Sequence, residues 1–398
     1  MIDKCYVIPV QNKCNCNCVF CISKTRNYNK EQEFLKCDNK FKDNIKLLKK
    51  RGIRKFEITG GGEPFLNKNL KDIVNSIKDL IPDSYIKLYT NGFILKYAGN
   101  IDELDISVVS DDSEVNLKYM LNKSRLRLME KLKYFRKVYP TIKIRLSVAL
   151  IKGAIDSKNK LDTFIQTTNK YVDEYVVRTL YPHTPNREEL FVDFEYENEK
   201  VVMERENDVK CFDGLILWSD NEFYKNWYLK EKRILYSYIL LKPDSKTYIK
   251  EIENFIYSKG FSIKQILHTN RFVEYSKGLY KDKDEEYFKI VERHLENVSY
   301  LFGNEGIVFI LDKDCDMESL VKETYELKLE IRNKYSFTHN KKGYLKIEDN
   351  ISHLNIVHCP DPNCKLFDRD INYLMNAKHT VINSKKYEDI KRYRSYTI

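Results

Sequence analysis

The sequence predicts an α/β protein in which a largely parallel sheet is followed by a smaller α+β sandwich. Between residues 5 and 180, short runs rich in β-branched and aromatic residues alternate with longer stretches of helical periodicity. From about Lys232 the chain changes character, and its strand and helix patterns follow a β-α-β-β-α-β order. A chain of 398 residues is long enough for two or three domains with cores of their own.

The composition is that of a globular protein without a membrane-spanning segment. Hydrophobic residues make up 42% and charged residues 32% of the chain, and no apolar run reaches membrane-spanning length. No secretory signal is visible, so ten cysteines indicate a reducing, cytoplasmic compartment in which clustered thiols bind metal. The net charge of +10 does not select a partner, because a basic surface attracts nucleic acids and phosphorylated small molecules alike.

Six strand-helix units are predicted in the first part of the chain. Units of this kind imply a parallel sheet that is open or partly closed, here a partial (β/α)6 barrel. Asp38 is the expected N-cap of the first helix, and Gly52 closes that helix. The expected strands are Cys5–Val10, Lys55–Thr59, Tyr85–Tyr89, Leu104–Val109, Ile142–Leu150 and Glu174–Leu180, and the expected helices are Asp38–Arg51, Asn69–Leu80, Val115–Tyr139 and Ser157–Tyr171.

Four cysteines follow the first predicted strand within eight residues. Cys14, Cys18 and Cys21 have the spacing C-x3-C-x2-C, and Phe20 precedes the last of them. Three thiolates hold three irons of a [4Fe-4S] cluster and leave the fourth iron open for a substrate. A structural zinc site and a disulfide knot are the competing interpretations. Cys16 is expected to be a bystander, because alternation along the loop should point it away from Cys14 and Cys18.

A glycine-rich turn follows the second predicted strand. Gly60-Gly61-Gly62-Glu63-Pro64 lets the backbone approach a ligand closely, and Glu63 offers a carboxylate to an amine. Thr90-Asn91-Gly92 closes the third strand. Both motifs lie at carboxyl ends of strands, where parallel sheets place their active sites.

The cysteine triad, the Gly-Gly-Glu-Pro turn and the Thr-Asn-Gly strand end together resemble the radical S-adenosylmethionine (SAM) superfamily over about the first 180 residues. The resemblance implies that Cys14, Cys18 and Cys21 hold a [4Fe-4S] cluster. It also implies that Gly61, Gly62 and Glu63 receive the methionine amine of SAM. Reductive cleavage of SAM would then give a 5'-deoxyadenosyl radical that abstracts a substrate hydrogen, with electrons from an external flavodoxin or ferredoxin type donor.

Polar residues at later strand ends are further candidates for this site. By their position, Ser110, Arg145 and Ser147 are candidates to contact the ribose or carboxylate of SAM, or the substrate, although a surface ion pair or cap is the commoner reason for any one of them. Residues 181–207 read as a linker with a short helix. The stretch from Cys211 to Tyr224 reads as a β-hairpin that holds no auxiliary cluster, because the partner cysteines are missing.

The order of strand and helix patterns in the last part of the chain predicts a ferredoxin-like α+β domain. The expected domain boundaries are 1–195 for the radical SAM partial barrel, 196–231 for the linker and hairpin, and 232–398 for this domain. Its expected strands are Ile234–Leu241, Phe261–Leu267 and Gly306–Leu311, and its expected helices are Tyr248–Lys259, Asp284–Leu295 and Met317–Arg332.

Three motifs of this domain resemble nucleoside diphosphate kinase over roughly Lys232 to Met375. They are Lys242-Pro-Asp at a strand end, Lys259-Gly-Phe after a helix, and Asn355-Ile-Val-His. The resemblance implies that His358 accepts a phosphoryl group and passes it to a second nucleotide, accompanied by Mg²⁺. Its implied nucleotide-binding residues are Lys242 and Lys346 for phosphate, Tyr280 beside the histidine, Arg332 and Thr338 for the phosphates, and Asn355 for the sugar. Asp368 or Asp370 would replace the family's glutamate that orients the ring.

The sequence therefore predicts a radical SAM enzyme that acts on a nucleoside or nucleotide, which the last domain binds or phosphorylates. Tethering two sites raises the effective concentration of one site's product at the other. The rival interpretations are a peptide- or protein-modifying enzyme with a degenerate recognition domain, and a tRNA-modifying enzyme that uses the basic surface. No RNA-binding motif supports the latter, so nucleic acid is not the favoured partner. Association into a homo-oligomer through the last domain is a further expectation from the kinase resemblance.

Overall fold

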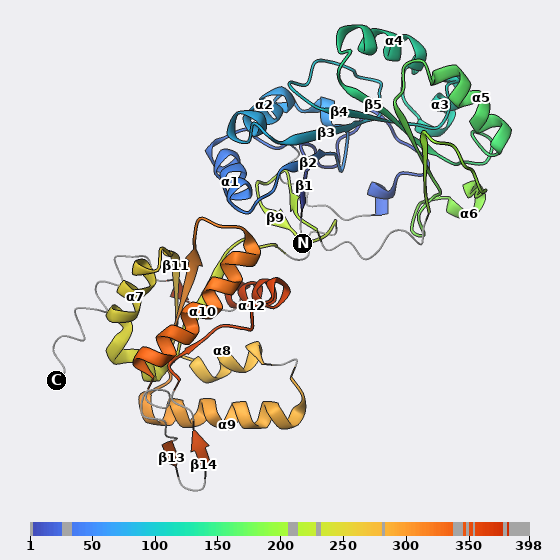
Figure 1. Ribbon diagram of the computed structural model, residues 1–398. Coiled ribbons are helices and arrows are strands. Elements are labelled where there is room, and N and C mark those ends of the chain that lie inside the picture. Colours follow the sequence, from blue (N-terminus) through green and yellow to red (C-terminus); the bar gives the residue numbers. More distant parts are fainter. Residues whose placement is uncertain are drawn as a thin grey trace. The chain divides into compact units, whose positions relative to one another are not determined.

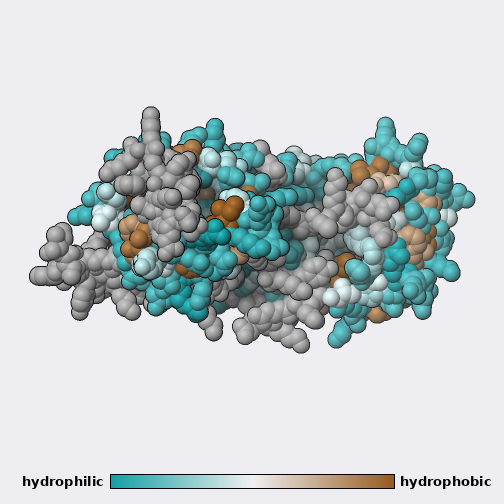
Figure 2. All heavy atoms as spheres, turned by 90° about the horizontal axis from the view of Figure 1, so that it is seen from below, coloured by the Kyte–Doolittle hydropathy of each residue, from teal (hydrophilic) through white to brown (hydrophobic). Residues whose placement is uncertain are grey.

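The computed structural model describes residues 3–25, 34–205, 214–227, 232–280, 283–336, 345–347, 350–352, 355–376 and 380–381. The chain divides into two compact units, Met1–Arg233 and Ile234–Ile398 (Figure 1). Each unit has its own sheet, and among the described strands none of one sheet pairs with a strand of the other. No described helix is both long enough and apolar enough to cross a membrane. On the face drawn in Figure 2, brown apolar residues lie in small groups among teal polar ones.

The first unit is built on a nine-stranded sheet in the order β7-β6-β5-β4-β3-β2-β1-β8-β9. All neighbours from β7 to β8 pair in parallel, and only β8 and β9 are antiparallel. The parallel sheet of an α/β fold, expected from the alternating pattern, is confirmed. The strands are β1 (Lys4–Val7), β2 (Lys55–Ile58), β3 (Tyr85–Thr90), β4 (Glu103–Val108), β5 (Lys143–Ala149), β6 (Glu174–Arg178), β7 (Val201–Glu204), β8 (Ile216–Leu217) and β9 (Phe223–Tyr224).

Helices follow most strands of this sheet and cover its apolar side. Asp38 caps the first helix by accepting a hydrogen bond from the Phe41 N–H at 2.9 Å, and Phe41, Ile45 and Leu48 are the buried residues of that helix. Figure 1 shows the helices following one another around one side of the curved sheet. They are α1 (Asn39–Lys50), α2 (Leu70–Leu80), α3 (Ser113–Met120), α4 (Leu128–Val138), α5 (Lys158–Thr168) and α6 (Arg187–Leu190).

Two expectations about this unit are wrong in detail. The helix expected over Val115–Tyr139 is interrupted, because Leu121 adopts a left-handed conformation with φ 47° and the chain leaves the helix until Leu128. The segment expected to be a linker contains β7, a seventh parallel strand that pairs with β6. The expected hairpin, β8 and β9, belongs to the same sheet, because β8 pairs with β1. Cys211 lies outside the described residues.

The second unit has a five-stranded sheet in the order β15-β10-β12-β11-β16, in which all neighbours are antiparallel. A separate hairpin is formed by β13 (Leu345–Ile347) and β14 (Asn350–Ser352). Helix α8 was not expected from the sequence, and α9 continues past the expected end at Leu295. The sheet strands are β10 (Ser237–Leu241), β11 (Ser262–Thr269), β12 (Gly306–Asp312), β15 (Val357–His358) and β16 (Thr380–Val381), and the helices are α7 (Ile249–Ser258), α8 (Phe272–Leu279), α9 (Glu285–Phe302), α10 (Met317–Tyr335) and α12 (Cys364–Asn376).

Candidate functional site

The cysteine loop follows β1 and is anchored by hydrogen bonds to the end of α3. The Asn17 N–H donates to the Met120 carbonyl and the Val19 N–H to the Tyr119 carbonyl, each at 3.0 Å. From the turn after α3, Asn122 Nδ2 donates to the Asn15 carbonyl at 2.9 Å. These contacts fix the loop backbone on both sides of Cys16. The left-handed conformation of Leu121, which ends α3, therefore places Asn122 next to the cysteine loop.

All four thiols of the loop are free, and none of them is buried. The expectation that Cys16 points away from Cys14 and Cys18 is wrong, because the Cys16 thiol lies within hydrogen-bonding reach of both. The hydrogen bond with Cys16, followed by burial, raises the pKa of Cys14 above its ordinary value. Alternation of side chains holds for a strand, and this segment is a loop whose turns the neighbouring elements impose.

The glycine-rich turn after β2 packs directly against the start of the cysteine loop. The Glu63 N–H donates to the Lys13 carbonyl at 2.9 Å. A Cβ atom at Gly62 would lie 2.0 Å from the Lys13 carbonyl oxygen, so only glycine fits at this position. Gly61 is buried and Gly62 half-buried. The turn therefore lies next to the segment that carries the thiols.

The Glu63 carboxylate connects this turn to the end of β3. Its Oε1 accepts hydrogen bonds from Thr90 Oγ1 at 2.8 Å and from the Phe65 N–H at 3.2 Å, and its Oε2 accepts from the Asn91 N–H at 2.8 Å. The side chain is only 2% exposed, and burial raises its pKa to about 7 against the opposing effect of these donors. Contact with the methionine amine remains a prediction for this residue.

The three weaker candidates, Ser110, Arg145 and Ser147, occupy different surroundings. Ser110 Oγ accepts a hydrogen bond from the Asp112 N–H at 3.1 Å, next to the N-cap of α3. Ser147 is 5% exposed, and its Oγ has no hydrogen-bond partner. A buried hydroxyl without a hydrogen-bond partner is rare, because losing its bonds to water costs free energy. A bound ligand that hydrogen-bonded to this hydroxyl would remove that cost. The contact of Ser147 with SAM therefore stays a prediction.

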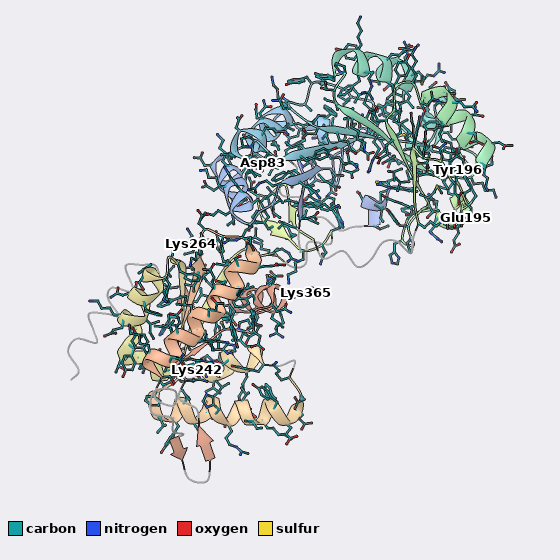
Figure 3. All side chains as sticks on the ribbon, viewed as in Figure 1. Asp83, Glu195, Tyr196, Lys242, Lys264 and Lys365 are labelled. Atoms are coloured by element: carbon teal, nitrogen blue, oxygen red, sulfur yellow. The ribbon has the colours of Figure 1, made fainter. Side chains whose placement is uncertain are left out.

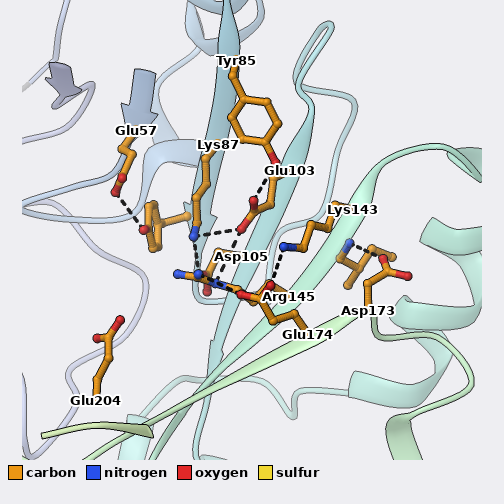
Figure 4. Close-up of polar contacts among 12 residues, drawn as sticks. Glu57, Tyr85, Lys87, Glu103, Asp105, Lys143, Arg145, Asp173, Glu174 and Glu204 are labelled. Carbon is orange, nitrogen blue, oxygen red and sulfur yellow. Dashed lines mark hydrogen bonds and ion pairs between the residues drawn. The ribbon is translucent and has the colours of Figure 1, made fainter. Parts of the chain in front are cut away.

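Arg145 is the exception, because its guanidinium is engaged by the sheet itself. It pairs with Asp105 at 2.6 Å and with Glu174 at 3.2 Å (Figure 4). Lys87 adds a further pair with Glu103 at 2.8 Å in the same row of side chains. Arg145 lies in the first half of β5, away from the carboxyl end at which the glycine turn and Asn91 lie. These ion pairs give Arg145 a structural role in the sheet, and its expected contact with SAM stays a prediction.

A second group of predicted residues meets in the second unit. His358 ends β15, and its Nδ1 lies 2.8 Å from the Tyr280 hydroxyl. Burial, followed by the charges of Lys242 and Arg332, lowers the pKa of His358 well below its ordinary value. The imidazole is therefore neutral at pH 7, which is the form that acts as a nucleophile.

Lys242 lies just beyond β10, beside α9 (Figure 3). Its Nζ lies 2.6 Å from Asn355 Oδ1 and 3.2 Å from Nε2 of His294, a residue of α9. Burial lowers the pKa of Lys242 to about 8. Arg332 of α10 donates to the Val357 carbonyl, next to His358 in the chain, at 2.8 Å. Three predicted residues from separated segments, Lys242, Tyr280 and Arg332, therefore act on His358, and a fourth, Asn355, contacts Lys242.

The sequence missed two residues of this group, His294 and Lys328. Lys328 of α10 donates to the Cys359 carbonyl at 3.1 Å and is 5% exposed. Neither residue belongs to a motif, and each occupies an ordinary position in an amphipathic helix, so no local signal could have identified it. Thr338 lies outside the described residues, and Lys346 is described only as backbone of β13.

Asp370, one of the two expected replacements for the glutamate that orients the ring, contacts Tyr238 and Arg369. Its Oδ2 accepts a hydrogen bond from the Tyr238 hydroxyl at 2.8 Å, and its Oδ1 pairs with Arg369 at 2.6 Å. Asp368 accepts from the Ile234 N–H at 3.4 Å. In the part of the chain that the structure describes, the hydrogen bond that orients the imidazole of His358 comes from Tyr280.

The residue types of the first unit suit an iron–sulfur cluster, because thiolates are its ligands, but no three His, Cys, Asp or Glu side chains of the described residues lie together as a ready-made metal-binding group. Cys14, Cys18 and Cys21 are free thiols on one loop, and Asn91 Nδ2 lies 3.6 Å from Cys14 Sγ as a further donor to sulfur. Residues 8–153 match the family model of the radical SAM superfamily. These residues form a radical SAM domain, whose cofactors are a [4Fe-4S] cluster and SAM. The expectations for the superfamily and for both cofactors are confirmed.

Curated relatives of this chain are named GTP 3',8-cyclase. The protein of Nautilia profundicola is 28% identical over 158 residues, which is 38% of this chain and 48% of that protein. The protein of Helicobacter pylori strain 26695 is 27% identical and covers 38% of this chain and 48% of that protein. The protein of Campylobacter jejuni is 36% identical over a shorter stretch, which is 22% of this chain and 28% of that protein. The chain spans at most about half the length of these relatives.

Similar solved structures include Streptococcus suis SuiB bound to the precursor peptide SuiA. It is 15% identical to this chain with a TM-score of 0.44, and the matched region covers 57% of this chain and 60% of that chain. Native anSMEcpe with bound AdoMet has 11% identity and a TM-score of 0.39, and it covers 56% of this chain and 74% of that one.

Proposed function

We propose that this protein uses its radical SAM domain to abstract a hydrogen atom from a nucleoside or nucleotide. The relatives named GTP 3',8-cyclase support a nucleotide substrate, because their names specify one. When bound, the cluster and SAM supply the 5'-deoxyadenosyl radical. The residues of this chain would hold them: Cys14, Cys18 and Cys21 bind iron, and the turn at Gly61 and Gly62 receives the methionine amine. An external electron donor and a cytoplasmic location belong to the same proposal.

We also propose that the second unit is a nucleoside-diphosphate-kinase-like domain that binds the nucleotide by its phosphates. The observation that carries this proposal is the contact of Tyr280 with His358, beside the contact of Lys242 with Asn355. Its topology is also compatible, since β10, β11, β12 and β15, counted as strands one to four, lie in the order 4-1-3-2 with α7 and α10 as crossovers. Clustered cations around a neutral imidazole suit the charge of a transferring phosphoryl group.

The first experiment tests the radical chemistry. The anaerobically reconstituted protein receives dithionite, SAM and a panel of nucleosides, nucleotides and short peptides, and mass spectrometry records 5'-deoxyadenosine and any modified product. We expect 5'-deoxyadenosine to rise above the uncoupled background only with particular nucleotides, together with a new nucleotide mass. A response to a peptide and to no nucleotide would overturn the proposed substrate class and make the second unit a recognition domain.

The second experiment tests phosphotransfer. Incubation with γ-labelled ATP should leave an acid-labile label on the chain, and His358→Ala should abolish that label. Tyr280→Phe, which keeps the ring and removes the hydroxyl that lies 2.8 Å from His358 Nδ1, should lower the labelling rate without abolishing it. If neither label nor nucleotide binding is found, the kinase-like assignment fails. Binding without label would restrict the unit to holding the nucleotide.

The kinase resemblance also leads us to infer association of this protein into a homo-oligomer through the second unit. Sedimentation at micromolar concentration should then detect a species larger than the 47.6 kDa chain. A single monomeric species would contradict this part of the proposal.

A further inference from the structure

The side chain of Asn91 reaches from the end of β3 to the cysteine loop. Its Nδ2 donates to Asn15 Oδ1 at 2.7 Å and lies 3.6 Å from Cys14 Sγ. Its Oδ1 accepts a hydrogen bond from the Phe93 N–H at 3.2 Å, which fixes the orientation of the amide. The NH₂ group, rather than the carbonyl oxygen, therefore faces the sulfur.

The backbone of Asn91 is held as firmly as its side chain. Its N–H donates to Glu63 Oε2 at 2.8 Å, and Gly92 follows with a φ of 75°, a conformation that favours glycine. A Cβ atom at Gly92 would also lie 2.7 Å from Ile106 Cγ2. Asn91 is 9% exposed, so the donor is held in place by its buried surroundings, whereas the Cys14 thiol that it faces is exposed.

We propose that Asn91 is a positioning residue that raises the reduction potential of the cluster by donating an N–H to the sulfur of Cys14. Hydrogen bonds to ligating sulfurs stabilise the more negative, reduced cluster, and neighbours of the ligands tune a metal site in this way. The inference rests on the proposed assignment of Cys14 as a ligand. This hydrogen bond would give the Thr-Asn-Gly motif a role in electron uptake by the cluster, in addition to its position at the end of β3.

Asn122 provides a matched control on the same loop. Its Nδ2 donates to the Asn15 carbonyl at 2.9 Å and to Cys16 Sγ at 3.3 Å. Both asparagines thus contact Asn15 and one sulfur, but Cys16 is outside the proposed ligand set. Loss of either side chain removes a similar number of loop contacts, and only loss of Asn91 removes a donor from a ligating sulfur.

The experiment is a redox titration of the reconstituted full-length protein without SAM, monitored by electron paramagnetic resonance, after iron and sulfide have been assayed. In Asn91→Ala, the ratio of reduced to oxidised cluster at a fixed potential should fall about tenfold, which corresponds to roughly 59 mV for a one-electron couple. Asn91→Asp should lower the midpoint further, because it removes the donor and adds a negative charge. Asn122→Ala should change the ratio less than about twofold.

Several outcomes would overturn the inference. An unchanged midpoint in Asn91→Ala would show that its hydrogen bond has no electronic effect. An equal shift in Asn122→Ala would assign the effect to the loop as a whole. Loss of iron in both Asn91 variants would make Asn91 a scaffold residue only. Cys14→Ala separates these cases from a wrong ligand set, since full iron content in that variant would refute the assignment of Cys14 itself.

Discussion

Asp105 carries a buried charge in the middle of the sheet, where a single residue matters most for stability. Its side chain is fully buried and pairs with Arg145 at 2.6 Å and Lys87 at 3.4 Å. Glu103 of the same strand pairs with Lys87 of β3, and Glu174 of β6 pairs with Arg145 of β5. Removing one partner of a buried pair leaves an uncompensated charge, and this costs more than the pair itself contributes.

Arg145→Met should therefore destabilise the first unit by about 3–5 kcal/mol, because Asp105 keeps only the longer contact to Lys87. Denaturant unfolding followed by circular dichroism measures the change. Ser107→Ala, an exposed position on β4, is the control and should stay within about 0.5 kcal/mol of the parent protein. A cost below about 1 kcal/mol for Arg145→Met would show that the row contributes little to stability.

Lys242 gives the second unit a pH dependence in the alkaline range. Its pKa is about 8 in the free protein because it is buried, and a bound phosphate raises that pKa towards the ordinary value of a lysine. The complex then holds more protons than the free protein above pH 8. Nucleotide affinity should be constant below pH 8 and fall by up to about tenfold per pH unit above it.

Calorimetric titration with ADP between pH 6.5 and 9.5 measures this dependence. His358 adds no titration in the range, since its pKa lies well below the ordinary 6.5. Lys242→Met should bind more weakly and show a flat profile. A profile in the parent protein that is flat across pH 8 would mean that Lys242 does not bind the phosphates.

At the scale of elements, the cysteine loop depends on two neighbours, the glycine turn after β2 and the end of α3. Gly62→Ala tests the first, because the added Cβ would meet backbone atoms of Lys13, the oxygen at 2.0 Å and the carbon at 2.7 Å. Backbone cannot move aside as a long side chain can. The turn must therefore shift away from the loop, together with Glu63.

We expect Gly62→Ala to weaken SAM binding at least tenfold and to reduce the iron content after reconstitution. Lys68→Ala, an exposed change in the same segment, should alter neither quantity. Iron analysis and equilibrium dialysis with labelled SAM measure the two effects. Unchanged SAM binding in Gly62→Ala would show that the turn is not part of the SAM site.

At the scale of the whole molecule, the chain consists of two compact units with separate sheets. We expect calorimetry of the full-length holoprotein to resolve two transitions. SAM should raise the temperature of one, and ADP that of the other. A ligand at 100 times its dissociation constant stabilises its unit by about 2.7 kcal/mol, or roughly 5–10 °C for units of this size.

Lys242→Met should remove the ADP effect and leave the SAM effect intact. A single transition that both ligands raise equally would show that the two units unfold as one cooperative body.

Local sequence determined much of this molecule. Six of the parallel strands were predicted to within a few residues, because β-branched runs bounded by turns form strands in many contexts. The C-x3-C-x2-C spacing identified the radical SAM domain, because the ligands of a cluster lie close together in the chain. Asp38 capped its helix as expected, which is an equally local effect.

Contacts between distant segments decided the rest. The break at Leu121 interrupts a continuous helical pattern so that Asn122 can reach Cys16, and β7 is a strand because β6 offers it an edge. Arg145 was expected at the cofactor and lies in an ion-pair row, and His294 beside Lys242 belongs to no motif. The sequence alone thus determined which thiols and turns carry the chemistry. Only the tertiary structure decided which side chains face them, because burial and pairing depend on partners far away along the chain.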